Sequence, residues 1–558
     1  MQFKLLAVAR SLPRRLLRHR WKRKSAQQGQ SFWDNLPVEL WYSIFSFLDR
    51  SELAALSSTC SFLRTLATPK LFSSLRLRVG HYTVFHLDDN EEGHAKLVKR
   101  STPVLRRLTK PGKLVGGQYV LNDLVRGLRI VAGMRLENKE KQIILLALRR
   151  LPNLIVFDWM GSKLPEDVAA TVASRRIETL RVASIGNSAL HELCALQGRL
   201  HAIELIDACL SSWKLIGPYA RDIFEGKYNT NPVQELLEHN DATLQRLSIF
   251  APDLRQNNTK LFDSFLKLTD NIVRLAINGT GDLPGFDQFL RHSSSLQSLT
   301  ILDATSLSFL PRNRKRSLPS LKDLKLGINT CPASTAGPDM QDLSQTLLAF
   351  LHDHLDLRRF DFSLWPFIDP TGEEPLEENR IWFSSIIEAV CSLKKACALG
   401  ISFPSLTINS IQESLNNLSK HAQSLEICTA LRLEGISSAS IDAVATKLRR
   451  CTFIALSSIR HSGTFRWLSE TPAITVEDLI QYHGLRHLGQ ALLYDRMYDI
   501  YPSGCSATEG VVLQPWNIDR VRWRTEADFY NLDAYWLMSY RFIRNIDVFI
   551  HPPPPVQN

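Results

Sequence analysis

Two groups of residues have the types, and nearly the spacing, that ligand-binding chemistry requires. The glycine-rich segment 279–285 has the composition of a phosphate-binding loop, but Pro284 interrupts it and its spacing differs from the dinucleotide pattern. His483 and His487 are four residues apart, as are two zinc ligands of metalloproteases, yet Gly484 stands in place of the catalytic glutamate. We predict a repeat turn and an ordinary helix at these two places, with no cofactor.

Other candidate groups are weaker. His352, Asp353 and His354 are consecutive, so on a helix their side chains would point in different directions, as on a solvated face. Cys391 and Cys397 are too far apart, and lack a histidine nearby, to predict a zinc site. The sequence contains no P-loop and no Gly-x-Ser-x-Gly nucleophile motif. We therefore expect a protein that is not an enzyme, with no catalytic residue and no metal site.

Composition indicates a globular chain. Apolar residues make up 44% and charged residues 22% of it, with a mean hydropathy of −0.11. The nine cysteines are odd in number and scattered among apolar residues, which favours thiols in a reducing compartment rather than a disulfide framework. No stretch approaches the ~20 apolar residues of a membrane span, so none is predicted.

The net charge of +11 comes largely from the amino-terminal arm, residues 1–30. Nine basic residues and no acidic residue precede Asp34, and the rest of the chain carries 58 basic against 56 acidic residues. Composition thus gives no reason to expect a nucleic-acid partner. The arm itself has four open interpretations: a solvated tail, a nuclear signal at 18–24, a mitochondrial presequence, or a membrane-surface helix. We expect a location in the cytoplasm, the nucleus or both.

A short helical module is predicted over residues 31–78. Apolar residues recur there at four-residue steps, at Leu36, Leu40, Ile44 and Leu48. This spacing places them on one face of a helix that begins at Pro37. Ser51 can cap a second helix, and a third, from Cys60, is expected to end at Thr68 and Pro69. Three short helices bury too little apolar surface to be stable alone, so a partner should cover part of the stripe.

This module resembles an F-box, the domain by which substrate receptors bind the Skp-family adaptor of a cullin-RING ubiquitin ligase. The resemblance rests on Leu-Pro-x-Glu-Leu at 36–40, Phe-x-x-Leu-Asp at 45–49, Leu-x-x-Leu-Ser at 53–57 and Arg-x-Leu-Ala-x-Pro-x-Leu-Phe at 64–72. Thr59 departs from the family, which more often has valine there. The resemblance implies an adaptor-binding surface made of Leu36, Pro37, Glu39, Leu40, Ile44, Phe45, Leu48, Leu53, Leu56, Cys60, Phe62 and Leu66.

The pattern Leu-x-x-Leu-x-Leu, with other apolar residues allowed, recurs through residues 151–465. Eight copies begin at Leu151, Ile177, Leu200, Leu244, Ile272, Leu296, Leu321 and Leu357, and weaker copies begin at Ala396, Ala422 and Cys451. Most steps between the eight fall in the range of about 20–29 residues typical of leucine-rich repeats. Each repeat should give a short parallel strand and a helix whose apolar faces only neighbouring repeats can cover. Only Asn329 supplies the turn asparagine of these repeats, so they are degenerate.

The predicted fold class is therefore α/β: a three-helix F-box, then a leucine-rich-repeat-like solenoid with a carboxy-terminal cap. Residues 79–150 are expected to form a connector, 466–550 the cap with a helix over 476–494, and 551–558 a proline-rich tail. By resemblance, the chain is expected to be the substrate receptor of an SCF-type ubiquitin ligase, with an unknown protein substrate. A non-proteolytic F-box scaffold is the alternative that stays open.

Overall fold

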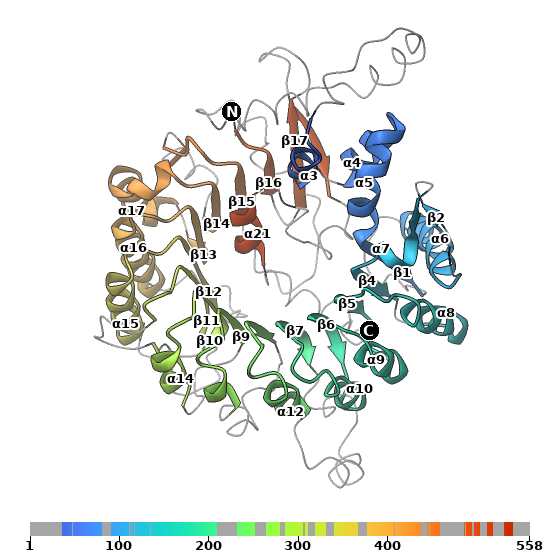
Figure 1. The fold of residues 1–558 in the computed structure, drawn as a ribbon. Helices are drawn as coiled ribbons and strands as arrows, with labels where there is room; N and C mark the ends of the chain where they lie inside the picture. The colour runs from blue at the N-terminus through green and yellow to red at the C-terminus, as the bar shows by residue number, and fades with distance from the viewer. Residues whose placement is uncertain are drawn as a thin grey trace, which may run out of the picture.

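The recurring apolar pattern produces one curved parallel sheet, preceded by a helical module (Figure 1). The structure is a computed structural model. It describes residues 36–80, 91–208, 232–250, 264–278, 285–310, 318–330, 340–366, 377–436, 444–457, 485–502, 511–516 and 529–539, apart from some positions inside these ranges. The α/β class and the order of helical module and solenoid are as predicted.

The module consists of three helices, α3 (Val38–Ser46), α4 (Arg50–Ser57) and α5 (Ser61–Ser73). The carbonyl oxygen of Pro37 accepts hydrogen bonds from the backbone N–H groups of Leu40 and Trp41, at 3.0 and 3.3 Å, so α3 begins one residue later than predicted. Cys60 caps α5, because its Sγ accepts from the Leu63 N–H at 3.4 Å.

Helix α5 does not end at Pro69 as the sequence predicted, but continues to Ser73. Proline inside a helix removes one backbone hydrogen bond. Here Leu66 and Ala67 are buried just before it, and the Thr68 hydroxyl donates to the Arg64 carbonyl at 2.6 Å. The helix therefore continues past the proline, and the first strand follows it directly.

In the described part of the chain, fourteen parallel strands line the inside of the solenoid, followed by two antiparallel ones at its carboxy-terminal end (Figure 1). The parallel strands are β1 (Ser74–Val79), β4 (Gly127–Ala132), β5 (Val156–Gly161), β6 (Thr179–Ile185), β7 (Ala202–Ala208), β8 (Arg246–Ile249), β9 (Arg274–Asn278), β10 (Ser298–Ala304), β11 (Asp323–Thr330), β12 (Arg359–Pro366), β13 (Ala398–Leu406), β14 (Ala430–Ile436), β15 (Phe453–Ser457) and β16 (Gln490–Leu493). The antiparallel strands are β17 (Arg496–Pro502) and β18 (Val511–Pro515).

The helices between the strands form the outer, convex side (Figure 1). They are α6 (Glu91–Leu108), α7 (Leu121–Leu124), α8 (Asn138–Leu148), α9 (Glu166–Ala173), α10 (Asn187–Leu193), α12 (Pro232–Glu238), α14 (Phe286–His292), α15 (Met340–Asp353), α16 (Glu377–Ser392), α17 (Ile408–His421) and the 3-10 helix η4 (Gln423–Glu426). A small hairpin, β2 (Leu114–Val115) with β3 (Tyr119–Val120), lies beside them. Alternate strand residues such as Leu299 and Ile301 pack against these helices in one continuous core.

Strand pairing corrects the predicted register in two repeats. The first copy, predicted at Leu151, Leu154 and Val156, is shifted by three residues, because Phe157 pairs with Leu180 and Trp159 with Val182. The weak copy predicted from Ala422 is also wrong. Its strand is β14, where Leu431 pairs with Leu399 and Leu433 with Ile401, while Leu425 lies in η4. In both repeats, leucines that precede the strand match the same apolar pattern as the strand itself.

The sheet also extends beyond the predicted repeats at both ends. β1 and β4 pair in register, so the solenoid sheet begins ahead of the connector predicted over 79–150 and continues through it. At the other end, the helix predicted over 476–494 is contradicted at Gln490–Leu493, which forms β16. A last helix, α21 (Leu532–Met538), lies inside the curve of the solenoid against β13 and β14 (Figure 1).

Candidate functional site

The helical module has its own small core, separate from that of the solenoid. Trp41, Phe45, Leu53, Leu66 and Ala67 form it, and the rings of Trp41 and Phe45 are 5.8 Å apart. Trp41 and Phe45 are one helical turn apart on α3, so they define the buried face of that helix. In the stripe predicted at Leu36, Leu40, Ile44 and Leu48, Leu40 is exposed and the other three are partly buried against this core.

The structure divides the predicted adaptor-binding residues into three groups. Phe45, Leu53 and Leu66 are buried in the module's own core. Leu36, Ile44, Leu48, Leu56 and Cys60 are half-buried, while Pro37, Glu39, Leu40 and Phe62 are exposed. Only the second and third groups can contact another protein directly. The three buried residues are expected to support that surface by packing beneath it.

Exposed apolar side chains are concentrated in this module. Among the described residues, four of the ten exposed large apolar side chains belong to it, although it is about a tenth of the chain: Val38, Leu40, Tyr42 and Phe62. Such a concentration is typical of surfaces that bind other proteins. The sequence prediction missed Val38 and Tyr42. The signal available in the sequence was their four-residue spacing. Both residues lie on the flank of α3 opposite to Leu40.

Helix α5 joins the module rigidly to the solenoid. Leu66 and Ala67 belong to the module's core, and Leu71 packs against it. Phe72, on the same helix, packs against the main core of the solenoid, and Ser74 begins β1 without an intervening loop. The exposed apolar surface therefore has a fixed orientation relative to the concave sheet.

The first part of the concave face carries a row of alternating charges. Arg129 Nε lies 2.7 Å from Asp158 Oδ2, and Arg181 lies 3.8 Å from Asp158 and 2.7 Å from Glu204. Burial alone would lower the pKa of Arg181, but Glu204 and Asp158 outweigh it and raise that pKa well above its usual value. These residues occupy equivalent positions in β4 to β7, so the ion pairs tie successive repeats together.

A second charged cluster lies on the concave face of β11 to β14. The side chains of Lys325, Asp361 and Arg432 are 5%, 1% and 3% exposed, and Asp361 pairs with both cations. The Arg432 guanidinium also donates to the Ser363 hydroxyl at 2.6 Å. Buried charges are costly unless paired and hydrogen-bonded, so this arrangement requires all its members.

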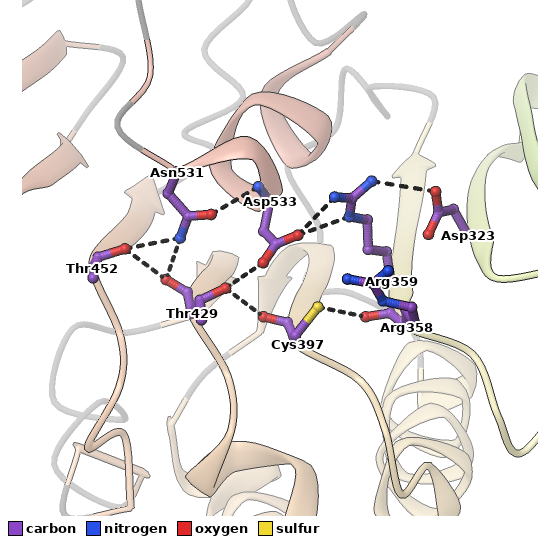
Figure 2. A network of polar contacts seen from close by, with 8 residues as sticks. All are labelled: Asp323, Arg358, Arg359, Cys397, Thr429, Thr452, Asn531 and Asp533. Carbon is purple, nitrogen blue, oxygen red and sulfur yellow. Dashed lines mark hydrogen bonds and ion pairs between the residues drawn. The ribbon is translucent and has the colours of Figure 1, made fainter. Parts of the chain in front are cut away.

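Helix α21 is bound at both ends by polar residues of this part of the concave face. Figure 2 shows the amino-terminal end, where the Arg359 guanidinium contacts Asp533 Oδ1 at 2.8 Å and Asp323 at 3.3 Å. The Thr429 hydroxyl donates to the other oxygen of Asp533, and Asn531 caps the helix by accepting from the Asp533 N–H at 2.8 Å. Burial alone would lower the pKa of Arg359, but Asp323 and Asp533 raise it.

At its carboxy-terminal end, α21 is held by Lys325. Lys325 Nζ donates to the backbone carbonyl oxygens of Trp536, Leu537 and Ser539, at 2.8, 2.8 and 3.0 Å. A cation at this position also complements the negative end of the helix dipole. Lys325 Nζ lies 4.9 Å from the centre of the Trp536 ring, which adds a cation–π contact.

The apolar side of α21 forms a second, smaller core on the concave face. Ala534, Leu537 and Met538 are fully buried there. The strand residues of this core include the small Ala398, Ala430 and Ala455 beside the larger Phe453, Leu492 and Met497. At Gly400, a Cβ would lie 2.2 Å from Asp361 Oδ1 and 3.1 Å from Leu537 Cδ2. The strands are thus shaped to accept a helix.

The structure describes only some of the residues first considered for chemistry. His354 Nδ1 lies 2.8 Å from the Phe350 carbonyl oxygen at the end of α15, and Asp353 is exposed. His483 and residues 279–284 lie outside the described residues, and Gly285 immediately precedes α14. Among the residues that the structure describes, no group of three His, Cys, Asp or Glu could hold a metal ion.

The described cysteines have free thiols. Burial raises the pKa of Cys194 and of Cys451 to about 12 and that of Cys391 to about 11. Because the thiolate is the reactive form, these three are poor nucleophiles at neutral pH. Within the described part of the chain, no helix is long and apolar enough to cross a membrane.

A comparison with known protein families supports the assignment of the helical module. Residues 33–78 match the family model described as F-box-like. Among curated proteins the chain has no significant match.

Similar solved structures include a leucine-rich-repeat protein of Leptospira interrogans, at 15% identity and a TM-score of 0.26, covering 67% of this chain and 72% of that one. The TLR13–ssRNA13 complex matches at 12% identity and 0.24, covering 66% and 55%. The Drosophila Toll–Spatzle complex matches at 11% identity and 0.23, covering 60% and 54%. At these TM-scores the likenesses say nothing of function, and the solenoid is defined by its own strands and helices. The chain has an F-box-like domain followed by a leucine-rich-repeat-like solenoid.

Proposed function

We propose that this protein is the target-recognition subunit of an SCF-type ubiquitin ligase. The observation that supports this most is the exposed apolar surface on α3 and α5 of an F-box-like domain, fixed by α5 to a large solenoid. By the family resemblance, this surface would bind a Skp-family adaptor and, through it, a cullin. We further propose that the protein acts without catalytic residues of its own, in the cytoplasm or the nucleus.

The adaptor surface proposed here is narrower than the sequence prediction. Leu40, Ile44 and Phe62 are at least partly exposed, so their apolar area would leave water when an adaptor binds. Each fully buried aliphatic side chain contributes roughly 1.5–3 kcal/mol. A few such side chains, with aromatic neighbours, are enough for the central part of a protein interface.

The solenoid supplies the target-binding part of the proposal. Concave surfaces of repeat proteins are extended, and their alternate strand residues are available for recognition. In this chain those positions carry charged residues such as Arg181 and Glu204. The fixed junction at α5 would place a bound target at a constant distance from the ligase.

The test measures binding to a purified Skp-family adaptor by isothermal titration calorimetry and by co-purification. Leu40→Glu places a charge in the apolar surface and should weaken binding at least about 100-fold. This change in the dissociation constant corresponds to about 2.8 kcal/mol. Leu146→Glu is a matched control, because Leu146 is 44% exposed on solenoid helix α8 and Leu40 is 49% exposed.

Equal binding by wild type and Leu40→Glu, or none by wild type, would contradict the proposal. Co-precipitation of a cullin and accumulation of a bound partner under proteasome inhibition separate a ligase subunit from a non-proteolytic scaffold. The scaffold would bind the adaptor but show neither of these two results.

A further inference from the structure

The concave face of β11 to β14 is built to hold a helix, and the chain fills it with its own α21. Three features of the site describe the ligand that it accepts. Arg359 and Thr429 bind a carboxylate in the first helical turn, and Lys325 binds the carbonyl oxygens at the helix end. Between these ends, small residues such as Gly400 leave room for apolar side chains.

Much of this recognition does not depend on the particular sequence of α21. Lys325 contacts backbone carbonyl oxygens, which every helix has at its carboxy-terminal end. The side-chain requirements are one carboxylate near the start, supplied by Asp533, and an apolar face with an aromatic residue, supplied by Trp536. A helix of about two turns with these features, from another protein, would meet the same contacts.

The solenoid core is complete without α21. The helix-facing residues of the strands beneath it, including Phe360, Ile401 and Leu433, belong to the main core. The side chains of α21 belong to the separate cluster on the opposite face of the sheet. The sheet therefore keeps its convex packing if α21 leaves, while α21, at seven residues, is too short to be a stable helix by itself.

Charge also favours a carboxylate-bearing ligand. Among the described residues of the cluster, the strands contribute three cations, Lys325, Arg359 and Arg432, and two carboxylates, Asp323 and Asp361. Asp533 supplies the third carboxylate. With α21 displaced, these five strand groups carry a net charge of +1, and Arg359 loses one of its two carboxylate partners, so the strand face attracts an acidic group.

We propose that the concave face of β11 to β14 is the target-binding site of this protein, and that it accepts an amphipathic helix with an acidic first turn and an aromatic residue in the second. Helix α21 occupies the site in the free chain, and a target competes with it. The inference rests on the proposed function, because it treats the solenoid as the surface that binds targets.

The test uses the full-length chain and a fluorescent peptide of residues 529–540, with binding measured by anisotropy. In the variant Asp533→Ala/Trp536→Ala the internal helix loses its carboxylate and its aromatic ring. The peptide should bind this variant at least about ten-fold more tightly than it binds wild type, because the site is no longer occupied in cis. A peptide carrying Asp533→Ala should bind the variant about ten-fold more weakly than the unaltered peptide.

Two controls locate the effect. Leu532→Ala alters an exposed residue of the same helix, 56% exposed, and should leave peptide binding as weak as in wild type. Adding Arg359→Gln to the double variant should remove the gain in binding, because Arg359 contacts the carboxylate. Adaptor binding, measured on the same samples, should be the same throughout. Its absence would count against the proposed function and leave the peptide result unaffected.

Equal peptide binding by wild type and the double variant would overturn the inference. So would loss of hydrogen-exchange protection in β11 to β14 in the double variant, since α21 would then be a permanent part of the fold. Hydrogen exchange of the Leu532→Ala chain provides the reference for a solenoid that has kept its structure.

Discussion

Helices α3 and α21 are both short and rich in apolar residues, yet they reach opposite states in this structure. On α3, Leu40 is 49% exposed, Trp41 and Phe45 are buried in the module's core, and Ile44 is partly buried against it. On α21, Leu537 is fully buried and charged groups of the sheet bind both helix ends. Neither helix could be stable alone. Helix α21 packs on a surface of the same chain, whereas α3 has exposed apolar side chains that we propose another protein covers.

The largest effect should come from the charge beneath α21. Asp361→Asn removes the carboxylate shared by Lys325 and Arg432, and breaking a buried pair in this way costs about 3–5 kcal/mol. We expect a lower midpoint of chemical denaturation and faster hydrogen exchange in β11 to β14 and α21. Asp356→Asn is the control, because Asp356 and Lys395 pair at the surface with side chains 80% and 64% exposed, and it should change neither measurement.

Gly400→Ala tests the fit of α21 to the sheet. The added Cβ would contact Asp361 Oδ1 and Leu537 Cδ2, and such overpacking costs about 1–3 kcal/mol. Hydrogen exchange should show α21 opening more often, while the module is unchanged. Gly127→Ala in β4 provides the comparison, since the nearest atom to its Cβ would be Ser74 Oγ, at 3.3 Å. An equally large loss of stability in Gly127→Ala would mean that the loss in Gly400→Ala does not come from contact with α21.

The smallest effect concerns the exposed partner surface of the module. Cys60 is half-buried at the start of α5 and belongs to the predicted adaptor surface. A Skp-family adaptor at ten times its dissociation constant should slow alkylation of Cys60 about ten-fold, measured by peptide mass spectrometry. Cys194 should react slowly with and without adaptor, because burial raises its pKa to about 12. An unchanged rate at Cys60 would remove this residue from the interface.

Local sequence patterns predicted the elements better than their register. Ile203 and Leu205 of β7 and Ile454 and Leu456 of β15 were assigned to strands correctly. The first repeat was misplaced by three residues since Leu151 and Leu154 give the same local pattern as the true strand. Only the pairing of Phe157 with Leu180 distinguishes the two alternatives.

The residues of the candidate site were likewise predicted only in part from the sequence. Leu40 and Phe62 were predicted from the F-box resemblance, and the structure places both at the surface. Phe45 and Leu53 were predicted with them, but they are buried, because a helical repeat does not show which of its apolar stripes faces the module's own core. The resemblance identified the domain, and burial separates the residues that can contact a partner.

By itself, the sequence determined the helical module, the α/β repeats and the order of both along the chain. These features depend on apolar periodicity and on a local motif, which are readable within a few tens of residues. The tertiary structure alone decided the position of α21. Lys325 and the Leu537 carbonyl that it binds are 212 residues apart, and the carboxylate that completes the cluster comes from Asp533. Contacts at such separations arise from the curvature of the whole sheet, which no local pattern encodes.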